Sequence, residues 1–325
     1  MPLPLVSIVI PTHNRPGLLL EAIQSVARQR YENWEAIIVD DGSQPPVAIE
    51  ALVLQFGSRV RGVRHESPLG GPAAKNSGAD AARGEILAFL DDDDLYAPAY
   101  VERAIQVLNR HPELDLVFMG VSWFGSSAQH GENAYRQGMD KTLAEASGNE
   151  IESGVLSFDG RLVKALLRRI PMAFQRPVVR RQAFLKIGGY QEGCLLWDCD
   201  WALRAAINAK AGLITEGLYL QRADGQGFSS KRDRKLDHLL SGVEIGERLL
   251  QVFAQGASKT ELKAFHEAAS TGWFNLAYYY CELGLVKRAL SAWWASQRHT
   301  ANLARGKLLV RLLLSVFRHK EKPVQ

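Results

Sequence analysis

The chain has 325 residues, of which 46% are hydrophobic and 23% are charged, and its formal net charge is +4. This length exceeds that of a typical single domain, and the apolar content is ample for a real core, so a chain without a core is excluded. The three cysteines, Cys194, Cys199 and Cys281, are too few and too irregularly spaced for a disulfide framework or a cysteine zinc site.

Apolar runs bounded by turn residues alternate with segments of helical spacing over the first 230 residues. The runs predict strands at residues 6–10, 34–39, 60–64, 86–90, 114–119 and 218–221. Helices are predicted at residues 16–29, 47–56, 72–82, 98–109, 161–169, 181–187 and 198–211. This alternation predicts βαβ units and an α/β fold with a mostly parallel sheet. The polar, aperiodic residues 120–154 indicate a loop over the site or a variable acceptor region, and residues 225–230 indicate a lid.

Four carboxylates, Asp91 to Asp94, follow directly after the apolar run of residues 86–90. In an open α/β sheet, ligands bind outside the carboxyl ends of the strands, so we expect the four acids at the ligand edge. A solvated acidic turn is the simplest alternative. Hard cations such as Mg²⁺ or Mn²⁺ prefer carboxylate oxygens, which favours a metal site. A phosphatase nucleophile is a third interpretation, weakened because Leu95 stands where Thr or Val would be expected.

Two further polar clusters lie at expected strand or helix ends. Asp40-Asp41 at the end of the second strand is either a simple turn or a contact for a nucleobase or ribose. Gly70-Gly71 before a helix is either a tight turn or a place where the chain approaches a diphosphate at the helix N-terminus. Neither cluster decides the function alone.

Together, four segments in this order and spacing resemble the family 2 glycosyltransferases, which have the GT-A fold. They are Val6-Ser-Ile-Val-Ile-Pro-Thr-His-Asn-Arg15, Ile37-Ile-Val-Asp-Asp-Gly-Ser43, Gly70-Gly-Pro-Ala-Ala-Lys-Asn-Ser-Gly78 and Gly84-Glu-Ile-Leu-Ala-Phe-Leu-Asp-Asp-Asp-Asp94. The resemblance covers roughly residues 5–230. It implies an inverting enzyme that uses a nucleotide-diphosphate sugar, a UDP-sugar before others, together with Mn²⁺ or Mg²⁺.

The resemblance also implies roles for individual residues. Asp93 would be the direct metal ligand, and Asp92 would contact the ribose. The residues expected to bind the donor are Pro11, Thr12, Asp40, Asp41, Lys75, Asp91 and Asp92.

A catalytic base is expected at Asp198, in a segment that resembles the family's Glu-Asp pair at the start of a helix. Trp197 replaces the usual Glu. Asp198 could equally cap the following helix, and both roles are compatible. Desolvation by Trp197 would raise the pKa of Asp198, which suits a base. Relatives often carry a His near the metal after the last strand, but residues 221–224 here contain none, and Asp224 is a candidate replacement ligand.

The region after residue 230 is helical in pattern, so we expect a GT-A domain at residues 1–230 and an α-helical region at residues 231–325. Trp273, Leu276, Ala277, Tyr280 and Gly284, with Ala289 and Trp293, match one tetratricopeptide-like helix pair, which we expect to pack on neighbouring helices.

Residues 285–325 are strongly basic, with nine Lys or Arg and one acid, so they sum to +8 and the rest of the chain to −4. The amphipathic residues 303–319 predict either a capping helix or an interfacial membrane helix. No signal peptide and no run of ~18 apolar residues is found, so we expect a cytoplasmic protein, peripheral on the inner face of the cell membrane. Nucleic acid is not an expected partner, while protein contact through the C-terminal helices is.

The overall prediction is a metal-dependent, inverting glycosyltransferase that acts on a glycan or lipid-linked acceptor in cell-surface polysaccharide or glycolipid assembly. The first alternative is an inactive nucleotide-sugar-binding or scaffold protein, which Trp197 and the missing His would suit. The second alternative is a nucleotidyltransferase or phosphatase on a similar sheet.

Overall fold

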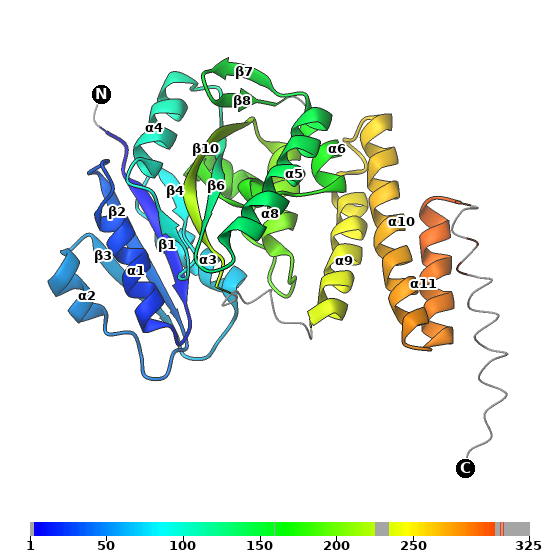
Figure 1. Cartoon of the computed structure of the whole chain (residues 1–325), viewed down its shortest axis with the longest axis horizontal. Coiled ribbons are helices and arrows are strands. Elements are labelled where there is room, and N and C mark those ends of the chain that lie inside the picture. Colours follow the sequence, from blue (N-terminus) through cyan, green and yellow to red (C-terminus); the bar gives the residue numbers. More distant parts are fainter. Residues whose placement is uncertain (1–2, 159, 225–233, 303–305, 307, 309–325) are drawn as a thin grey trace, which may run out of the picture. The chain divides into compact units, whose positions relative to one another are not determined.

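The computed structural model describes residues 3–158, 160–224, 234–302, 306 and 308, and it divides into two compact units (Figure 1). The first unit comprises Met1–Gly193 and Trp197–Ser230, and the second comprises Cys194–Leu196 and Lys231–Gln325. The lid predicted at residues 225–230 lies outside the described residues, and so does the helix predicted at 303–319 apart from residues 306 and 308. Within the described ranges, no helix is both long enough and apolar enough to cross a membrane.

In the described part of the first unit, ten strands form one mixed sheet in the order β3-β2-β1-β4-β9-β6-β10-β8-β7, with β5 paired to β10. Strands β1, β2, β3, β4, β6 and β10 run parallel, while β9 lies antiparallel between β4 and β6. The strands are β1 Val6–Thr12, β2 Trp34–Asp41, β3 Val60–His65, β4 Ile86–Phe89, β5 Leu95–Tyr96, β6 Leu116–Phe124, β7 Asn149–Glu152, β8 Val155–Ser157, β9 Pro177–Arg180 and β10 Ala211–Arg222. The predicted α/β class is confirmed.

Helices flank this sheet and bury the strands on both faces (Figure 1). They are α1 Pro16–Ala27, α2 Ile49–Phe56, α3 Gly71–Ala81, α4 Tyr100–Arg110, α5 Ala128–Ala146, α6 Arg161–Arg168, α7 Arg181–Ile187 and α8 Trp197–Asn208, with a 3₁₀ helix at Met172–Gln175. Every residue of β2 and β4 is buried, as expected for strands covered on both faces.

Helix α3 lies unusually close to the sheet, and this position brings its side chains to the ends of β1 and β2. The close approach depends on Gly78, where a Cβ would be 2.3 Å from Val9 Cγ1 and 3.0 Å from Val39 Cγ2. Gly70, with a φ of 96°, turns the chain immediately before the helix. The helix therefore begins at the carboxyl edge of the sheet.

The prediction of a loop at residues 120–154 is wrong. Strand β6 continues to Phe124, and the 19-residue helix α5 and strand β7 occupy much of the remainder. The helix buries only Met139, Thr142 and Ala146, so its sequence carries no regular apolar stripe. An amphipathic pattern is absent where a helix covers little of the core.

The second unit contains the helices α9 Lys235–Phe253, α10 Lys259–Glu282 and α11 Val286–His299, and α10 packs against both others. Ser258 caps α10: its hydroxyl accepts a hydrogen bond from the Glu261 amide, and the Glu261 carboxylate accepts one from the Ser258 amide. The turn before α11 contains Gly284 at a φ of 71°. The buried core of the three helices is formed by Val243, Leu276, Ala277, Ala289 and Ala292, with Leu308 beside them.

Candidate functional site

The acidic run begins where β4 ends, beside the end of β1. These two strands pair in parallel, with Val6 opposite Ile86 and Val9 opposite Phe89. Because of this register, Thr12 at the end of β1 reaches Asp92, and its Oγ1 donates a 2.7 Å hydrogen bond to Asp92 Oδ2. The acids thus lie at the carboxyl edge of the sheet, as the sequence predicts.

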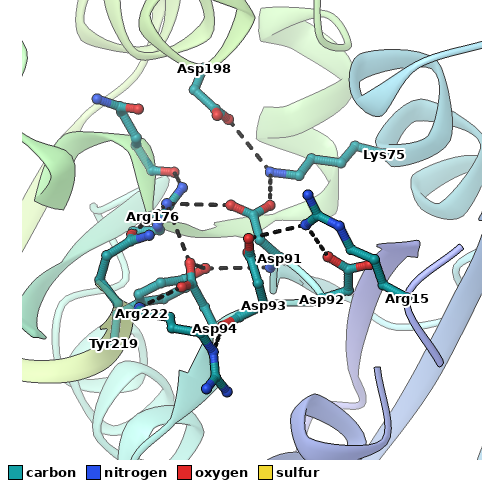
Figure 2. A network of polar contacts seen from close by, with 12 residues as sticks. Arg15, Lys75, Asp91, Asp92, Asp93, Asp94, Arg176, Asp198, Tyr219 and Arg222 are labelled. Atoms are coloured by element: carbon teal, nitrogen blue, oxygen red, sulfur yellow. Dashed lines mark hydrogen bonds and ion pairs between the residues drawn. The ribbon is translucent and has the colours of Figure 1, made fainter. Parts of the chain in front are cut away.

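Arg15 holds two of the four acids together. Its Nη1 is 3.1 Å from Asp92 Oδ1 and 3.1 Å from Asp93 Oδ2 (Figure 2). Burial raises the pKa of Asp92 to about 6, although Thr12 and Arg15 favour its charged form. Burial and the charge of Asp91 likewise raise the pKa of Asp93. A single guanidinium therefore offsets part of the repulsion between neighbouring carboxylates.

Asp91 lies between two buried cations. Lys75 Nζ, from α3, is 2.8 Å from its Oδ1, and Arg176 Nη2 is 3.3 Å from its Oδ2. Burial acts to raise the pKa of Asp91, but Lys75 and Arg176 outweigh it and lower this pKa to about 2. Asp91 therefore stays charged at physiological pH.

Asp94 is completely buried and turns away from the ligand edge into the protein. Its Oδ2 accepts a 2.9 Å hydrogen bond from the Tyr219 hydroxyl, and its Oδ1 accepts one of 2.8 Å from the Arg222 amide. Burial raises its pKa to about 7 despite Arg176, whose Nη2 is 3.6 Å away. Asp94 thus joins the run to β10 and is a structural residue.

Asp198 lies in the first turn of α8, one residue after the helix begins. Its Oδ1 is 3.5 Å from Lys75 Nζ (Figure 2). This oxygen is buried, and no donor in the described part of the chain makes a hydrogen bond to it. Burial raises the pKa of Asp198 to about 6, Lys75 opposes the rise, and Asp91 adds to it. Apart from the long ion pair with Lys75, no donor in the described part of the chain competes for the proton-accepting position of this oxygen.

The residues predicted to line the base pocket lie at the ends of β1 and β2, where Pro11 is opposite Val39 and Thr12 is opposite Asp40. The oxygens of Asp40 accept hydrogen bonds from the Ser43 amide at 2.9 Å and the Val47 amide at 3.0 Å, and Arg64 contacts the same carboxylate. Asp40 therefore shapes the loop that follows β2.

Asp41 fixes a second loop. Its carboxylate accepts bonds of 2.8 Å from the amides of Leu69 and Gly70, and His65 Nδ1 lies 2.7 Å from Oδ1. The acid thereby positions the start of α3, the helix that carries Lys75. These contacts of Asp40 and Asp41 do not involve the acidic run. The network of Figure 2 joins Lys75 and Asp198 to that run, and Thr12 reaches the run through its hydrogen bond to Asp92.

The carboxylate of Asp93 suits a hard cation that takes most of its other ligands from a bound diphosphate. Across the residues that the structure describes, no three His, Cys, Asp or Glu side chains are grouped as a metal site. Mg²⁺ commonly takes only one or two protein carboxylates and obtains its other ligands from phosphates and water. Asp93, with 14% of its side chain exposed, can supply one such carboxylate. Asp224 is engaged by the Ser126 amide at 2.6 Å and hydroxyl at 2.9 Å.

Arg176 and Arg15 are parts of this network to which the sequence assigned no role. Arg176 precedes β9 and lies 4.5 Å over the Tyr219 ring, and its Nη2 donates to Gln221 Oε1 at 2.8 Å. Nothing in the local sequence indicates that this arginine meets Asp91. Arg15, in contrast, is the last residue of the first of the four motif segments, so its position in the sequence could have indicated that it lies at the site.

Residues 7–164 match the description "Glycosyl transferase family 2". An uncharacterized glycosyltransferase of Rickettsia felis is 36% identical over 117 residues, which make up 36% of this chain but only 19% of that protein. Among solved structures, residues 1–349 of S. aureus TarS with UDP-GlcNAc superpose with a TM-score of 0.58 at 15% identity, over 93% of this chain and 91% of that fragment.

A mannosyltransferase of Pyrobaculum calidifontis, solved with GDP-Man and Mn²⁺, superposes with a TM-score of 0.54 at 16% identity, over 98% of this chain and 87% of that one. At such identities the likeness establishes the fold, which is GT-A, as the sequence predicts.

Proposed function

Residues 7–164 belong to glycosyl transferase family 2, and we propose that the chain moves a sugar from a nucleotide-diphosphate sugar to a hydroxyl acceptor with inversion at the anomeric carbon. Two proteins of the same fold support this choice of donor, since one was solved with UDP-GlcNAc and the other with GDP-Man. A UDP-sugar is the first donor to test. The GT-A domain spans residues 1–230, and the helical region spans residues 231–325.

The observation that carries the proposal is the position of Asp198. A base for an acceptor hydroxyl needs an ionisable group near neutrality, an oxygen free to accept a proton, and a place beside the donor site. Asp198 has a pKa raised to about 6, and its buried Oδ1 accepts no hydrogen bond from the described residues and makes a long ion pair of 3.5 Å with Lys75, the ammonium that it shares with Asp91. With one base and no enzyme nucleophile, the reaction is a single displacement. The acceptor oxygen attacks the anomeric carbon on the face opposite the leaving group, so the configuration of that carbon is inverted.

In the proposed reaction, Asp198 takes the proton from the acceptor hydroxyl as its oxygen bonds to the anomeric carbon. The bond from that carbon to the diphosphate oxygen breaks, and the nucleoside diphosphate leaves with the electron pair. Lys75 and Arg176 keep Asp91 ionised at the edge of the site. The transition state should carry positive charge on the sugar ring, as in glycoside hydrolysis.

On the donor side, Pro11, Thr12, Asp40 and Asp41 line the proposed base pocket, and Asp92 contacts the ribose. Thr12 supports this role by holding the Asp92 carboxylate at 2.7 Å. Asp93 is the proposed ligand for Mn²⁺ or Mg²⁺, which would neutralise the charge of the leaving diphosphate when bound. The Mn²⁺ in the mannosyltransferase complex supports a divalent cation.

The acceptor that we propose is a glycan or lipid-linked molecule of cell-surface polysaccharide or glycolipid assembly. A membrane location of the chain would suit such an acceptor, and residues 285–325 carry a charge of +8. Such a segment would attract an anionic membrane from the cytoplasmic side. Flotation with anionic vesicles, with and without residues 303–325, tests this contact: vesicle binding that is equal in both forms would remove the tail from the proposal.

The decisive experiment combines the purified chain with UDP-GlcNAc or GDP-mannose and Mn²⁺ or Mg²⁺. A donor that raises the melting temperature is then incubated with candidate acceptors, and released UDP or GDP is measured. Release that requires an acceptor supports the transferase. Donor binding with no transfer to any acceptor, in the wild type as in Asp198→Asn, would instead favour the inactive binding protein.

A further inference from the structure

The ring of Trp197 lies against the ammonium group that joins the two acids. Lys75 Nζ is 4.2 Å from the centroid of the Trp197 ring and 5.5 Å from that of the Tyr190 ring. Aromatic faces attract cations, and the attraction grows when the cation is withdrawn from water. Only 2% of the Lys75 side chain is exposed. Its ammonium is therefore enclosed by aromatic faces and by the carboxylates of Asp91 and Asp198.

Trp197 is itself held by two neighbours. Tyr190 meets it edge to face, with ring centroids 5.1 Å apart and an interplanar angle of 89°. Gly71 lies so close that a Cβ there would be 3.3 Å from Trp197 Cζ2. Gly71 and Lys75 are four residues apart on α3 and so share one face of that helix. The indole ring covers this face over a full turn.

We propose that Trp197 is a positioning residue whose ring holds the Lys75 ammonium at the point where it bridges Asp91 and Asp198. This inference rests on the proposed function, because it assigns Lys75 the task of keeping the base beside the donor site. A lysine side chain is flexible and its ammonium can rotate freely, so two carboxylates alone leave several arrangements open. The ring selects one of them.

Trp197 is an uncharged partner for the Lys75 ammonium, and a charged residue in its place would act differently. A carboxylate at position 197 would compete with Asp91 and Asp198 for the same ammonium. It would also add a negative charge beside a base whose pKa already responds to Asp91. The indole ring attracts the cation without either effect.

The direct test observes the Lys75 ammonium by NMR in the ligand-free protein, with Lys75→Arg to assign the signal. A cation over an aromatic face is shielded by the ring current, so its protons should resonate upfield of those of exposed lysines. Trp197→Leu should move this signal downfield and speed its exchange with water, while Trp197→Phe should preserve part of the shift. Trp294→Leu, at a tryptophan with 64% exposure in the helical unit, should leave the signal unchanged.

The kinetic test uses the donor and acceptor found by nucleotide release. Trp197→Leu should lower kcat about 2- to 30-fold, the range of one cation–π contact, with little change in donor affinity. Trp197→Phe should restore most of the rate. Should the leucine variant fail to fold, Trp197→Met serves in its place.

Two kinds of failure are separable. If the wild type transfers no sugar, or if Asp198→Asn keeps full activity, the proposed function fails. The NMR signal of the Lys75 ammonium then remains as the test of whether Trp197 positions Lys75. If the wild type is active and Asp198→Asn is not, a Trp197→Leu variant with an unchanged signal or an unchanged rate overturns the positioning role.

Discussion

Lys75 Nζ lies 3.5 Å from Asp198 Oδ1, although the two side chains come from different helices, α3 and α8. The same nitrogen is 2.8 Å from Asp91 Oδ1. One buried ammonium therefore sets the distance between the acidic run and the proposed base. Because α3 packs closely on β1 and β2, this distance depends on the rigid part of the fold.

Asp198→Asn should lower kcat by about 10²- to 10⁴-fold, because an amide cannot take the acceptor proton. Donor affinity should stay near that of the wild type, since the amide keeps the shape of the side chain. Nucleotide release and calorimetric titration of the donor measure the two effects. The matched control, Asp80→Asn, changes an exposed acid on α3 and should be silent. Near-full turnover in Asp198→Asn would exclude this residue as the base.

The reaction should lose rate in acid as Asp198 becomes protonated. Its pKa is raised to about 6 by burial, so kcat/KM should be level above this pH and fall tenfold per unit below it. A pH profile between 5 and 8 measures the midpoint. Donor affinity at each pH separates this effect from Asp92, whose pKa is also raised to about 6. A midpoint near 4 would argue against a buried base.

Removing the metal should abolish transfer if Asp93 binds a cation on the diphosphate. Dialysis against EDTA should stop nucleotide release, and Mn²⁺ or Mg²⁺ should restore it. Asp93→Asn should need a higher metal concentration for half-maximal rate, because an amide oxygen carries no charge. Full activity in EDTA, after verified removal of metal by mass spectrometry, would contradict the proposal.

Arg176→Met should destabilise the protein by about 3–5 kcal/mol, because it removes the cation that pairs with buried Asp94 and one of the two cations that pair with Asp91. The affected acids are Asp91 and Asp94, at 3.3 Å and 3.6 Å from Arg176 Nη2. Urea unfolding at pH 7 measures the loss. Arg168→Met is the control: its pair with Glu145 is exposed and should contribute at most about 1 kcal/mol. Equal losses in the two variants would show that Arg176 is dispensable.

Glu35→Gln should destabilise the protein by about 1–3 kcal/mol at neutral pH. Burial acts to raise the pKa of Glu35, but hydrogen bonds from Ser7 and the Arg83 amide, with Arg61, outweigh it and lower this pKa below its usual 4.5. A lowered pKa stabilises the folded state above the unfolded value, and this stability is lost as pH falls through the folded value.

The difference between the wild type and Glu35→Gln should therefore shrink in acid. Unfolding at pH 7 and at pH 3 measures it, and Glu32→Gln, at an exposed position, serves as the control. A difference that stays constant with pH would show that the charge of Glu35 is not what stabilises the sheet.

Local patterns were enough to predict the parallel half of the fold. The runs that became β1, β2 and β4 are apolar because both faces are covered, and the acids at their ends follow from the direction of the strands. The family resemblance added Asp198 and Lys75, whose roles remain predictions. The structure contributes their geometry, a shared ion pair that no spacing in the sequence reveals.

The rest depends on contacts between distant segments. Strand β9 has four residues, Pro-Val-Val-Arg, too few to carry a pattern, and its place in the sheet is set by its two neighbours. Arg176 meets Asp91 only because β9 is inserted beside β4. Helix α5 escaped prediction for a different reason, since it buries so few side chains that its polar surface resembles a loop.

Strand β9 also determines when the two parts of the sheet can join during synthesis. β4 and β6 each hydrogen-bond to β9, so their facing edges stay open until residues 177–180 have left the ribosome. Unpaired strand edges recruit other chains and promote aggregation. A fragment ending at residue 164 would keep both edges exposed and would lack β10 beside β6. The four residues of β9 thus join two parts of the sheet that would otherwise expose aggregation-prone edges.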